Sequence, residues 1–433
     1  MRTERIAQGH VAAVLDARLL TGDPAPIAIA FSGGGDSLAL LLAARSWAHS
    51  RRRPLVALTV DHGLRPESAA WTAFCQARAT ALGVEHRILT WEGWKPTARV
   101  SAAARAARHR LLADAARAAG ARVILMGHTA DDCAEAALMR QSGSTTPSPQ
   151  IWAPSPVWPE GRGVFLLRPL LGVGRAALRD ALSELGETWI DDPGNIDPRS
   201  ARARARMLIA GGFRVAEPIA DSRPPMAPAI PIADIVWGPA GDLSVPIDAL
   251  ADPADGLRLL GVALLCAAGG ERPPRRAPLA ALMARLASRE RFAATLAGCR
   301  VQCDGLQAQL VRDAGDARSR AVTDIPLPAG GTVVWDGRFE VRAKAPGAIV
   351  GPLAGRAARL APGLRRALAD VAPAARRALP RVTFADGREA LPTVRPDPGV
   401  DIRLLAPARH AATLGAFIDE AALRRIAKPV LPY

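Results

Sequence analysis

An apolar run at residues 27–31 leads directly into a glycine-rich turn at residues 32–37, and a helical pattern follows at residues 38–48. Glycines let a backbone approach an anion closely, and the N-terminus of a helix adds free amide donors and the positive end of the helix dipole. The turn consists of Ser32, Gly33, Gly34, Gly35, Asp36 and Ser37. A strand, a turn and a helix in this order predict an anion-binding loop. A glycine turn without a ligand is the alternative, and the two serine hydroxyls, which add donors, argue against it.

Strand and helix patterns alternate through the first half of the chain. Further strands are expected at residues 55–60, 86–91 and 123–126, and helices at residues 69–82, 101–119 and 131–141. The stretch at residues 143–163, rich in proline, serine and threonine, is expected to be a loop. The alternation predicts an α/β fold, in which a twisted parallel sheet carries helices on both faces. Ligands of such sheets bind at the carboxyl ends of the strands, where the polar motifs of this sequence fall.

The composition changes after the alternating region. Residues 1–212 are expected to form a catalytic domain, and the proline-rich residues 213–241 a linker. Residues 242–320 show helical patterns, and residues 321–433 are expected to form a small mixed domain. Hairpins are expected in both of these regions, turning at Asp304-Gly305 and at Asp336-Gly337. The sequence therefore predicts a smaller α+β region after the α/β domain.

The chain carries a formal net charge of +15, which comes almost entirely from arginine. Arginine binds phosphate with a planar fork and stacks on bases, so this surplus favours a polyanionic partner such as a nucleic acid. A genome rich in G and C would also raise the arginine and alanine content. The many alanines and few lysines of the chain keep that alternative open.

The five cysteines are irregularly spaced, with no Cys-x-x-Cys pair and no histidine cluster at metal-ligand spacing. A disulfide framework, a zinc site and a cysteine-ligated iron–sulfur cluster are therefore not expected. The N-terminal segment contains charged side chains throughout, unlike a signal peptide. The most apolar helical pattern, at residues 257–269, is too short to span a bilayer. We therefore expect a cytoplasmic protein with no membrane partner.

A second polar motif follows the strand expected at residues 123–126. Asp132 and Glu135 lie three positions apart at the start of a helix, so they share one helical face. Paired carboxylates at the end of a strand can bind an ammonium group and later accept its protons. The alternative is that Asp131 caps the helix and that acidic side chains merely favour the helix dipole. Capping explains Asp131 well but Glu135 poorly.

Arginines form two clusters in the first domain. Arg105 and Arg108 lie one turn apart on a predicted helix, and a later cluster comprises Arg202, Arg204 and Arg206. A solvated helix face is the ordinary explanation of either cluster. Next to a nucleotide site, however, the arginines could neutralise phosphates or bind RNA. In the glycine turn, Asp36 could hold a magnesium ion that bridges phosphates.

The pattern Ser-Gly-Gly-x-Asp-Ser of the glycine turn resembles the loop of the N-type ATP-pyrophosphatases, or PP-loop superfamily, and lacks the lysine of a Walker loop. Within that superfamily, an ordered set of motifs resembles the tRNA(Ile)-lysidine synthases. After the turn come Val-Asp-His-Gly-Leu-Arg at residues 60–65, the arginine helix, His-x-x-Asp-Asp-x-x-Glu at residues 128–135, and Asp-Pro-x-Asn-x-Asp with alternating arginines at residues 192–206. The resemblance covers roughly the first half of the chain and implies an adenine nucleotide alpha hydrolase-like fold.

The resemblance implies a two-step reaction. Enzymes of this family use ATP and Mg²⁺ to adenylate the C2 oxygen of the wobble cytidine in the isoleucine tRNA with a CAU anticodon, releasing pyrophosphate. Free L-lysine then expels AMP, which leaves lysidine. By position, residues 32–37 would bind ATP, with Asp36 on the metal, and Asp132 and Glu135 would receive the lysine ammonium. The resemblance also suggests that residues 242–320 bind tRNA, and it is compatible with a homodimer.

Phosphate charge would be stabilised in the same site. Arg105 would be the catalytic arginine, and the remaining residues of the nucleotide site would be Asp61, His62, Arg202, Arg204 and Arg206. A carbonyl oxygen is a poor leaving group and AMP is a good one, so activation must precede attack by the amine. Charge that develops on phosphate calls for arginines and a metal ion already in place.

Some positions depart from the family pattern, and two other functions stay open. Residues 141–144 are Gln-Ser-Gly-Ser where members often have Arg-Gly-Ser-Gly, and Ala136 and Ala203 stand where Thr and Asn are common. One alternative is another tRNA modification by the same superfamily, such as thiolation, for which the usual Cys-x-x-Cys pairs are missing. The other is a catalytically inactive, nucleotide-dependent RNA-binding protein, which the intact acidic residues argue against.

Overall fold

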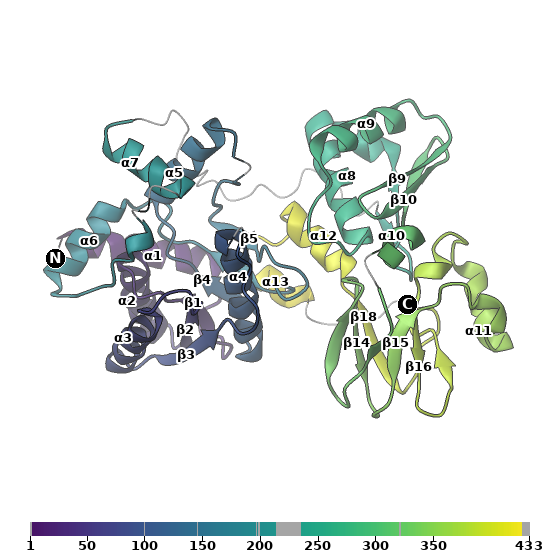
Figure 1. Cartoon of the computed structure of the whole chain (residues 1–433), viewed down its shortest axis with the longest axis horizontal. Helices are drawn as coiled ribbons and strands as arrows, with labels where there is room; N and C mark the ends of the chain where they lie inside the picture. Colours follow the sequence, from purple (N-terminus) through teal and green to yellow (C-terminus); the bar gives the residue numbers. More distant parts are fainter. Residues whose placement is uncertain are drawn as a thin grey trace. The chain divides into compact units, whose positions relative to one another are not determined.

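The computed structural model describes residues 2–98, 100–144, 146–195, 197, 200–213, 235–319 and 322–426. The chain forms two compact units, shown in Figure 1 and treated separately below. The first comprises Met1–Met226 with Phe417–Lys428, and the second comprises Ala227–Ala416 with Pro429–Tyr433. Most of the linker predicted at residues 213–241 lies outside the described residues.

The first unit is built on a six-stranded sheet with the strand order β3-β2-β1-β4-β6-β5. The pairs β3–β2, β2–β1, β1–β4 and β4–β6 are parallel, and β5 is antiparallel to β6. The strands are β1 (Ile27–Ala30), β2 (Leu55–Asp61), β3 (Glu85–Thr90), β4 (Val123–Leu125), β5 (Trp152–Pro154) and β6 (Phe165–Leu167). The predicted α/β fold is confirmed. The stretch expected to be a loop at residues 143–163 contains β5, so that prediction was incomplete.

The four helices expected at residues 38–48, 69–82, 101–119 and 131–141 are all observed, and further helices precede and follow them (Figure 1). They are α1 (Arg2–Arg18), α2 (Gly35–Ser50), α3 (Ser68–Ala81), α4 (Val100–Ala118), α5 (Ala130–Gln141), α6 (Arg175–Glu184), the short helix η1 (Pro193–Asn195) and α7 (Ala201–Ala210). Helix α4 buries Leu112 and Ala116 against Val56, Leu58 and Ile124 of the sheet. Helix α2 begins just beyond the end of β1, and α5 begins beyond the end of β4, so both helices start at the carboxyl edge of the sheet.

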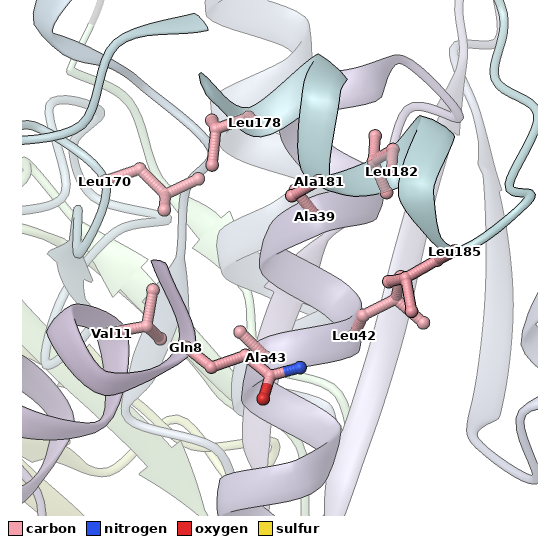
Figure 2. Close-up of a pocket in the computed structure, with 10 residues that line it drawn as sticks. All are labelled: Gln8, Val11, Ala39, Leu42, Ala43, Leu170, Leu178, Ala181, Leu182 and Leu185. Atoms are coloured by element: carbon pink, nitrogen blue, oxygen red, sulfur yellow. The ribbon is translucent and has the colours of Figure 1, made fainter. Parts of the chain in front are cut away.

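Helix α6 packs on α1 and α2 through apolar side chains. Figure 2 shows Leu178, Ala181 and Leu182 of α6 beside Ala39 and Ala43 of α2, around a pocket in which Gln8 is the one polar lining residue. An apolar pocket of this kind does not suit a charged nucleotide. The packing of α6 on α2 holds the first residue of α6 near the start of α2.

A C-terminal segment returns to the first unit. It contains Phe417 and helix α13 (Glu420–Ile426), which the sequence analysis had grouped with residues 321–433. The indole Nε1 of Trp152 donates to the carbonyl oxygen of Phe417 (2.7 Å), and the Phe417 ring packs edge-on against Phe165. These partners lie far away in the sequence, so no local pattern signals the contact.

The second unit combines three sheets. The first has the order β7-β8-β11-β10-β9, the second β12-β15-β16-β17 and the third β13-β14-β18. Their strands are β7 (Val236–Trp237), β8 (Leu243–Pro246), β9 (Phe292–Leu296), β10 (Cys299–Cys303), β11 (Gln307–Arg312), β12 (Ile325–Pro326), β13 (Thr332–Trp335), β14 (Phe339–Ala343), β15 (Ile349–Pro352), β16 (Pro380–Thr383), β17 (Glu389–Ala390) and β18 (Val400–Leu404). The pairs β10–β11 and β13–β14 are antiparallel, which confirms both predicted hairpins.

The long helices of the second unit contribute to the hydrophobic core around its first sheet. The longer ones are α8 (Pro253–Ala267), α9 (Arg276–Ala287) and α12 (Ala406–Leu414). Leu259, Leu260 and Ala263 of α8 are buried in one cluster with Val245 and Leu310 of the sheet. The shorter helices are α10 (Ala314–Ser319), α11 (Pro362–Ala367), η3 (Ile247–Leu250), η4 (Ala357–Arg359), η5 (Leu368–Asp370) and η6 (Arg376–Ala378). Among all described helices of both units, none combines the length and apolar character needed to cross a membrane.

Candidate active site

The glycine turn is held in place by its own serines. The hydroxyl of Ser37 donates to the carbonyl oxygen of Gly34 (2.8 Å) and accepts from the backbone amide of Ser32 (3.3 Å). Gly33 has φ +80°, a left-handed conformation that glycine adopts without strain. Ser37 is buried, whereas Ser32 is exposed. The turn therefore presents Ser32 and the first amides of α2 to a ligand, while Ser37 fixes its conformation.

Two glycines allow close packing around the turn. A Cβ atom on Gly127, at the end of β4, would lie 3.1 Å from the carbonyl oxygen of Asp36. A Cβ atom on Gly33 would lie 2.5 Å from Cδ1 of Ile190, whose amide donates to the carbonyl oxygen of Gly33 (2.9 Å). The missing side chain at Gly127 thus lets the end of β4, and the acidic helix that follows it, approach the start of α2.

The acidic helix α5 is capped by Thr129, so the alternative prediction that Asp131 is the cap was wrong. Asp132 Oδ2 accepts from the backbone amide of Thr129 (2.8 Å) and from its hydroxyl (3.0 Å). Asp131 Oδ2 instead accepts from the backbone amide of Arg175 (2.7 Å). One oxygen of Asp132 therefore serves the helix end, and Asp131 ties the start of α6 to the site.

Arg175, the first residue of α6, is a site residue that the sequence analysis missed. Its Nε lies 3.0 Å from Asp36 Oδ2, its Nη1 3.2 Å from Glu135 Oε1 and its Nη2 3.5 Å from Asp132 Oδ2. The structure thus brings the predicted residues Asp36, Asp132 and Glu135 together around one guanidinium. The only signal in the sequence was an arginine directly after Gly174 at the start of a helical stretch.

Helix α7 contributes two of the three predicted arginines to the same cluster. Arg206 Nε lies 2.8 Å from Glu135 Oε1, and Arg202 Nε lies 3.3 Å from Glu135 Oε2. The side chain of Glu135 is only 1% exposed, so this carboxylate is buried among guanidinium groups. Arg202 and Arg206 are four positions apart and share a helical face, whereas Arg204 is exposed on another side of α7.

Helix α4 adds positive charge close to Asp132. Burial lowers the pKa of Arg105, with a further lowering from the charge of Arg202 and an opposing effect of Asp132. Burial also lowers the pKa of Arg108 to about 10, and Arg105 contributes to this. Arginines that depress one another's pKa form a field that favours an anion. The predicted phosphate-binding role of Arg105 is consistent with this field.

A histidine and a further arginine extend the positive region. The pKa of His128 lies well below its usual value because the ring is buried, and Arg168 contributes further. The ring is therefore neutral, and its Nδ1 lies 3.1 Å from Arg168 Nε, which is the donor. Burial lowers the pKa of Arg168 to about 10. Neither residue is among the predicted site residues, although His128 belongs to the acidic motif.

The residues present fit a magnesium ion that arrives with a nucleotide. Burial raises the pKa of Asp36, and the charge of Arg175 opposes this. Among the residues that the structure describes, no three histidine, cysteine or acidic side chains are grouped to hold a metal by themselves. Magnesium commonly binds through one or two carboxylates together with substrate phosphates and water. Asp36 at the glycine turn suits that arrangement.

Asp61 and His62 lie at the carboxyl end of β2, beside β1 in the sheet. Asp61 Oδ1 accepts from the amide of Gly63 (2.8 Å), and the His62 ring lies edge-on to Trp91 with centroids 6.0 Å apart. Burial lowers the pKa of His62, and the charge of Arg108 adds to this. Asp61 contacts its own turn and His62 contacts Trp91 after β3, and the predicted role of both residues in nucleotide binding stays a prediction.

A family model and several known proteins resemble this chain. Residues 8–211 match the family model of the PP-loop domain. A tRNA(Ile)-lysidine synthase from Caulobacter vibrioides is 47% identical over 418 residues, which are 95% of this chain and 98% of that protein. Proteins of the same name from Hyphomonas neptunium and Ruegeria pomeroyi are 41% and 35% identical, over 64% and 76% of this chain and 78% and 79% of their own lengths.

Proposed function

The chain belongs to the tRNA(Ile)-lysidine synthase family, and we propose that the cluster around Arg175 carries both halves of the family's reaction. The enzyme is an ATP-dependent ligase that modifies tRNA. The observation that carries the proposal is that one guanidinium contacts Asp36 on the nucleotide loop and Glu135 on the acidic helix. A nucleotide at the turn and an amine at Glu135 would therefore be neighbours, as adenylation followed by amine attack requires.

In the first half of the reaction, the turn at residues 32–37 binds the phosphates of ATP. Ser32 and the amides at the start of α2 supply donors, and the dipole of α2 favours the negative charge. Asp36 would hold a magnesium ion that arrives with the nucleotide, and the ion would neutralise negative charge on the departing pyrophosphate. Arg105, with Arg108 one turn further along α4, stabilises the charge of the phosphate. The base oxygen attacks the α-phosphorus and displaces pyrophosphate, which leaves the base adenylated.

In the second half, Asp132 and Glu135 bind the ammonium of L-lysine. Asp132 has one oxygen engaged by Thr129, whereas its Oδ1 is turned toward Arg202, 4.0 Å away. The amine must lose a proton before it attacks the adenylated carbon, and carboxylates within hydrogen-bond reach accept it. An acidic pair beside a nucleotide loop suits an amine substrate, and lysine is the amine that we propose.

The RNA substrate is proposed to be the isoleucine tRNA with a CAU anticodon. Support comes from the names of the relatives and from the net charge of +15. We assign tRNA binding to the helices and hairpins of residues 242–320. A cytoplasmic location follows from a tRNA substrate, and the homodimer suggested by the resemblance is proposed without further support.

Thiolation is disfavoured by the state of the cysteines. Burial raises the pKa of Cys75 to about 11 and the pKa values of Cys266 and Cys299 to about 12. A sulfur carrier needs an accessible thiolate, and buried thiols with raised pKa values do not provide one. Cys133 is only partly buried but has no neighbouring cysteine in the sequence.

The proposal is tested by incubating the protein with ATP, Mg²⁺, labelled lysine and isoleucine tRNA with a CAU anticodon. Label should enter the tRNA only when all components are present. A tRNA whose wobble cytidine is replaced by uridine is the matched control and should stay unlabelled. Incorporation no greater than without enzyme would remove the lysidine assignment, and sulfur incorporation in its place would favour thiolation.

A further inference from the structure

The Arg175 guanidinium connects carboxylates that the proposed function divides between two substrates. Asp36 serves the nucleotide, and Asp132 and Glu135 serve lysine, yet all three lie within 3.5 Å of this one side chain. The backbone of Arg175 is fixed as well, because its amide donates to Asp131 (2.7 Å). If the Arg175 guanidinium moves to another partner, both the nucleotide site at Asp36 and the lysine site at Asp132 and Glu135 are therefore affected.

In this structure, the negative charge of Glu135 is neutralised by guanidinium groups. Besides Arg175, its carboxylate pairs with Arg202 (3.3 Å) and Arg206 (2.8 Å), and its side chain is almost fully buried. An additional cation would be brought next to these guanidinium groups and repelled by them. The lysine ammonium can bind at Glu135 only when one of the guanidinium groups moves away.

Arg175 is the guanidinium that a bound nucleotide is able to move. Asp36 belongs to the glycine turn, so phosphates at the turn would lie beside the group that pairs with it. A guanidinium forms charge-assisted, often bidentate hydrogen bonds with phosphate. Arg202 and Arg206 come from α7 and pair with the acidic helix rather than with Asp36. Phosphates at the turn thus compete for Arg175 first.

We propose that Arg175 is a positioning residue that makes lysine binding depend on bound nucleotide. The inference rests on the proposed function. Without nucleotide, Arg175 neutralises Asp132 and Glu135 and competes with the lysine ammonium. When ATP occupies the turn, its phosphates draw the guanidinium toward them, and the freed carboxylates bind the ammonium. Lysine then enters beside a nucleotide that can activate the base.

The coupling works in both directions. If nucleotide tightens lysine binding by some factor, lysine must tighten nucleotide binding by the same factor. We expect a factor of about tenfold, within the usual range for such couplings and equal to about 1.4 kcal/mol. The coupling factor can therefore be measured either from the affinity for lysine or from the affinity for nucleotide, and neither measurement requires catalysis.

The test is equilibrium dialysis of labelled lysine against the full chain, with and without saturating α,β-methylene-ATP and Mg²⁺. In the wild type, the analogue should lower the dissociation constant of lysine about tenfold. In Arg175→Gln, lysine should bind without nucleotide about as tightly as it binds the wild type with analogue, and the analogue should change little. An Arg175→Gln protein that keeps the wild-type dependence on the analogue, or that binds lysine more weakly without nucleotide, would overturn the inference.

Two further variants test whether the effect of Arg175→Gln on lysine binding is specific to that side chain. Arg175→Lys retains a positive charge but cannot span three carboxylates, so its dependence on the analogue should be intermediate; full wild-type dependence would count against the inference. Arg87→Gln removes an exposed arginine that pairs with Glu85, and it should match the wild type. Wild-type binding of lysine that ignores the analogue overturns the inference alone, whereas no lysine binding under either condition overturns the proposed function with it.

Discussion

Arg53 and Glu420, which lie 367 positions apart, form a buried two-pronged ion pair with N–O distances of 3.0 Å on each side. The two side chains are 0% and 3% exposed. Glu420 Oε2 also accepts from the amide of Leu20 (2.8 Å), and Arg424 of the same helix pairs with the buried Asp23. The C-terminal helix α13 is therefore part of the structure of the catalytic unit.

Substitution of Glu420 by Gln is expected to destabilise the catalytic unit. The change leaves the Arg53 guanidinium buried without its counter-charge, which typically costs roughly 3–5 kcal/mol. Urea unfolding of the full chain measures the free energy of unfolding. The control is Glu85→Gln, which breaks an exposed pair with Arg87 and should cost less than about 1 kcal/mol. Equal effects of the two changes would show that α13 is not integral to the unit.

Glu135→Gln is expected to weaken the use of lysine more than the use of ATP. The amide keeps the shape of the side chain but removes the charge that the ammonium requires, so the KM for lysine should rise roughly 10–100-fold. The KM for ATP, measured at lysine concentrations that saturate the variant, should change by less than about tenfold, because Glu135 lies on the acidic helix and acts on the nucleotide only through its coupling to lysine. Glu67→Gln, an exposed change, is the control. An unchanged KM for lysine would place the ammonium site elsewhere.

Asp36→Asn is expected to lower tRNA-dependent pyrophosphate release by at least about 100-fold, because the metal ion and its charge neutralisation are lost. The affinity for nucleotide should also lose its dependence on magnesium, and titration calorimetry measures this without catalysis. Asp191→Asn is the matched control, since Asp191 pairs with Arg179 at an exposed site of the same unit. Full pyrophosphate release by the Asp36 variant would contradict the metal-binding role.

The buried His109 on α4 makes stability depend on pH. Burial, followed by the charges of Arg108 and Arg105, lowers the pKa of this ring to about 2 from an ordinary value of 6.5. Below pH 6.5 the unfolded chain takes up a proton that the folded chain does not, so the contribution is present above pH 6.5 and is lost as the pH falls toward 2. Between pH 7 and pH 5 the loss should be about 2 kcal/mol.

His109→Leu removes this pH-dependent contribution. The difference in free energy of unfolding between pH 7 and pH 5 should be smaller in the variant than in the wild type by about 2 kcal/mol. The control His49→Leu, at an exposed position of α2, should keep the wild-type pH dependence. Parallel pH profiles of the His109 variant and the wild type would contradict the assigned pKa.

Features encoded in continuous segments could be predicted from the sequence. The helix expected at residues 131–141 is observed at Ala130–Gln141, and the strand expected at residues 55–60 at Leu55–Asp61, because local periodicity carries that information. The three-residue strand β6 is too short to show a period, so it was missed. Its neighbour β5 is equally short and lies in a proline-rich stretch, so it was missed as well.

Features that depend on distant partners could not be predicted. Arg175 stands 40 positions from Glu135 and 139 from Asp36, and no spacing rule relates them. The folded sheet brings their elements to one edge, and only then does the arginine acquire its partners. The cap of α5 was a different error, because Asp131 is a good capping residue by type but the preceding Thr129 takes that role.

The proposed reaction requires that the base oxygen is adenylated at the glycine turn before the amine attacks, and the fate of that oxygen shows whether this happens. Isoleucine tRNA carrying oxygen-18 at C2 of the wobble cytidine is reacted with ATP, Mg²⁺ and lysine, and the AMP is analysed by mass spectrometry. We predict that the AMP released carries the heavy oxygen in its phosphate, in an amount equal to the lysine incorporated. Unlabelled AMP accompanying lysidine formation would contradict it.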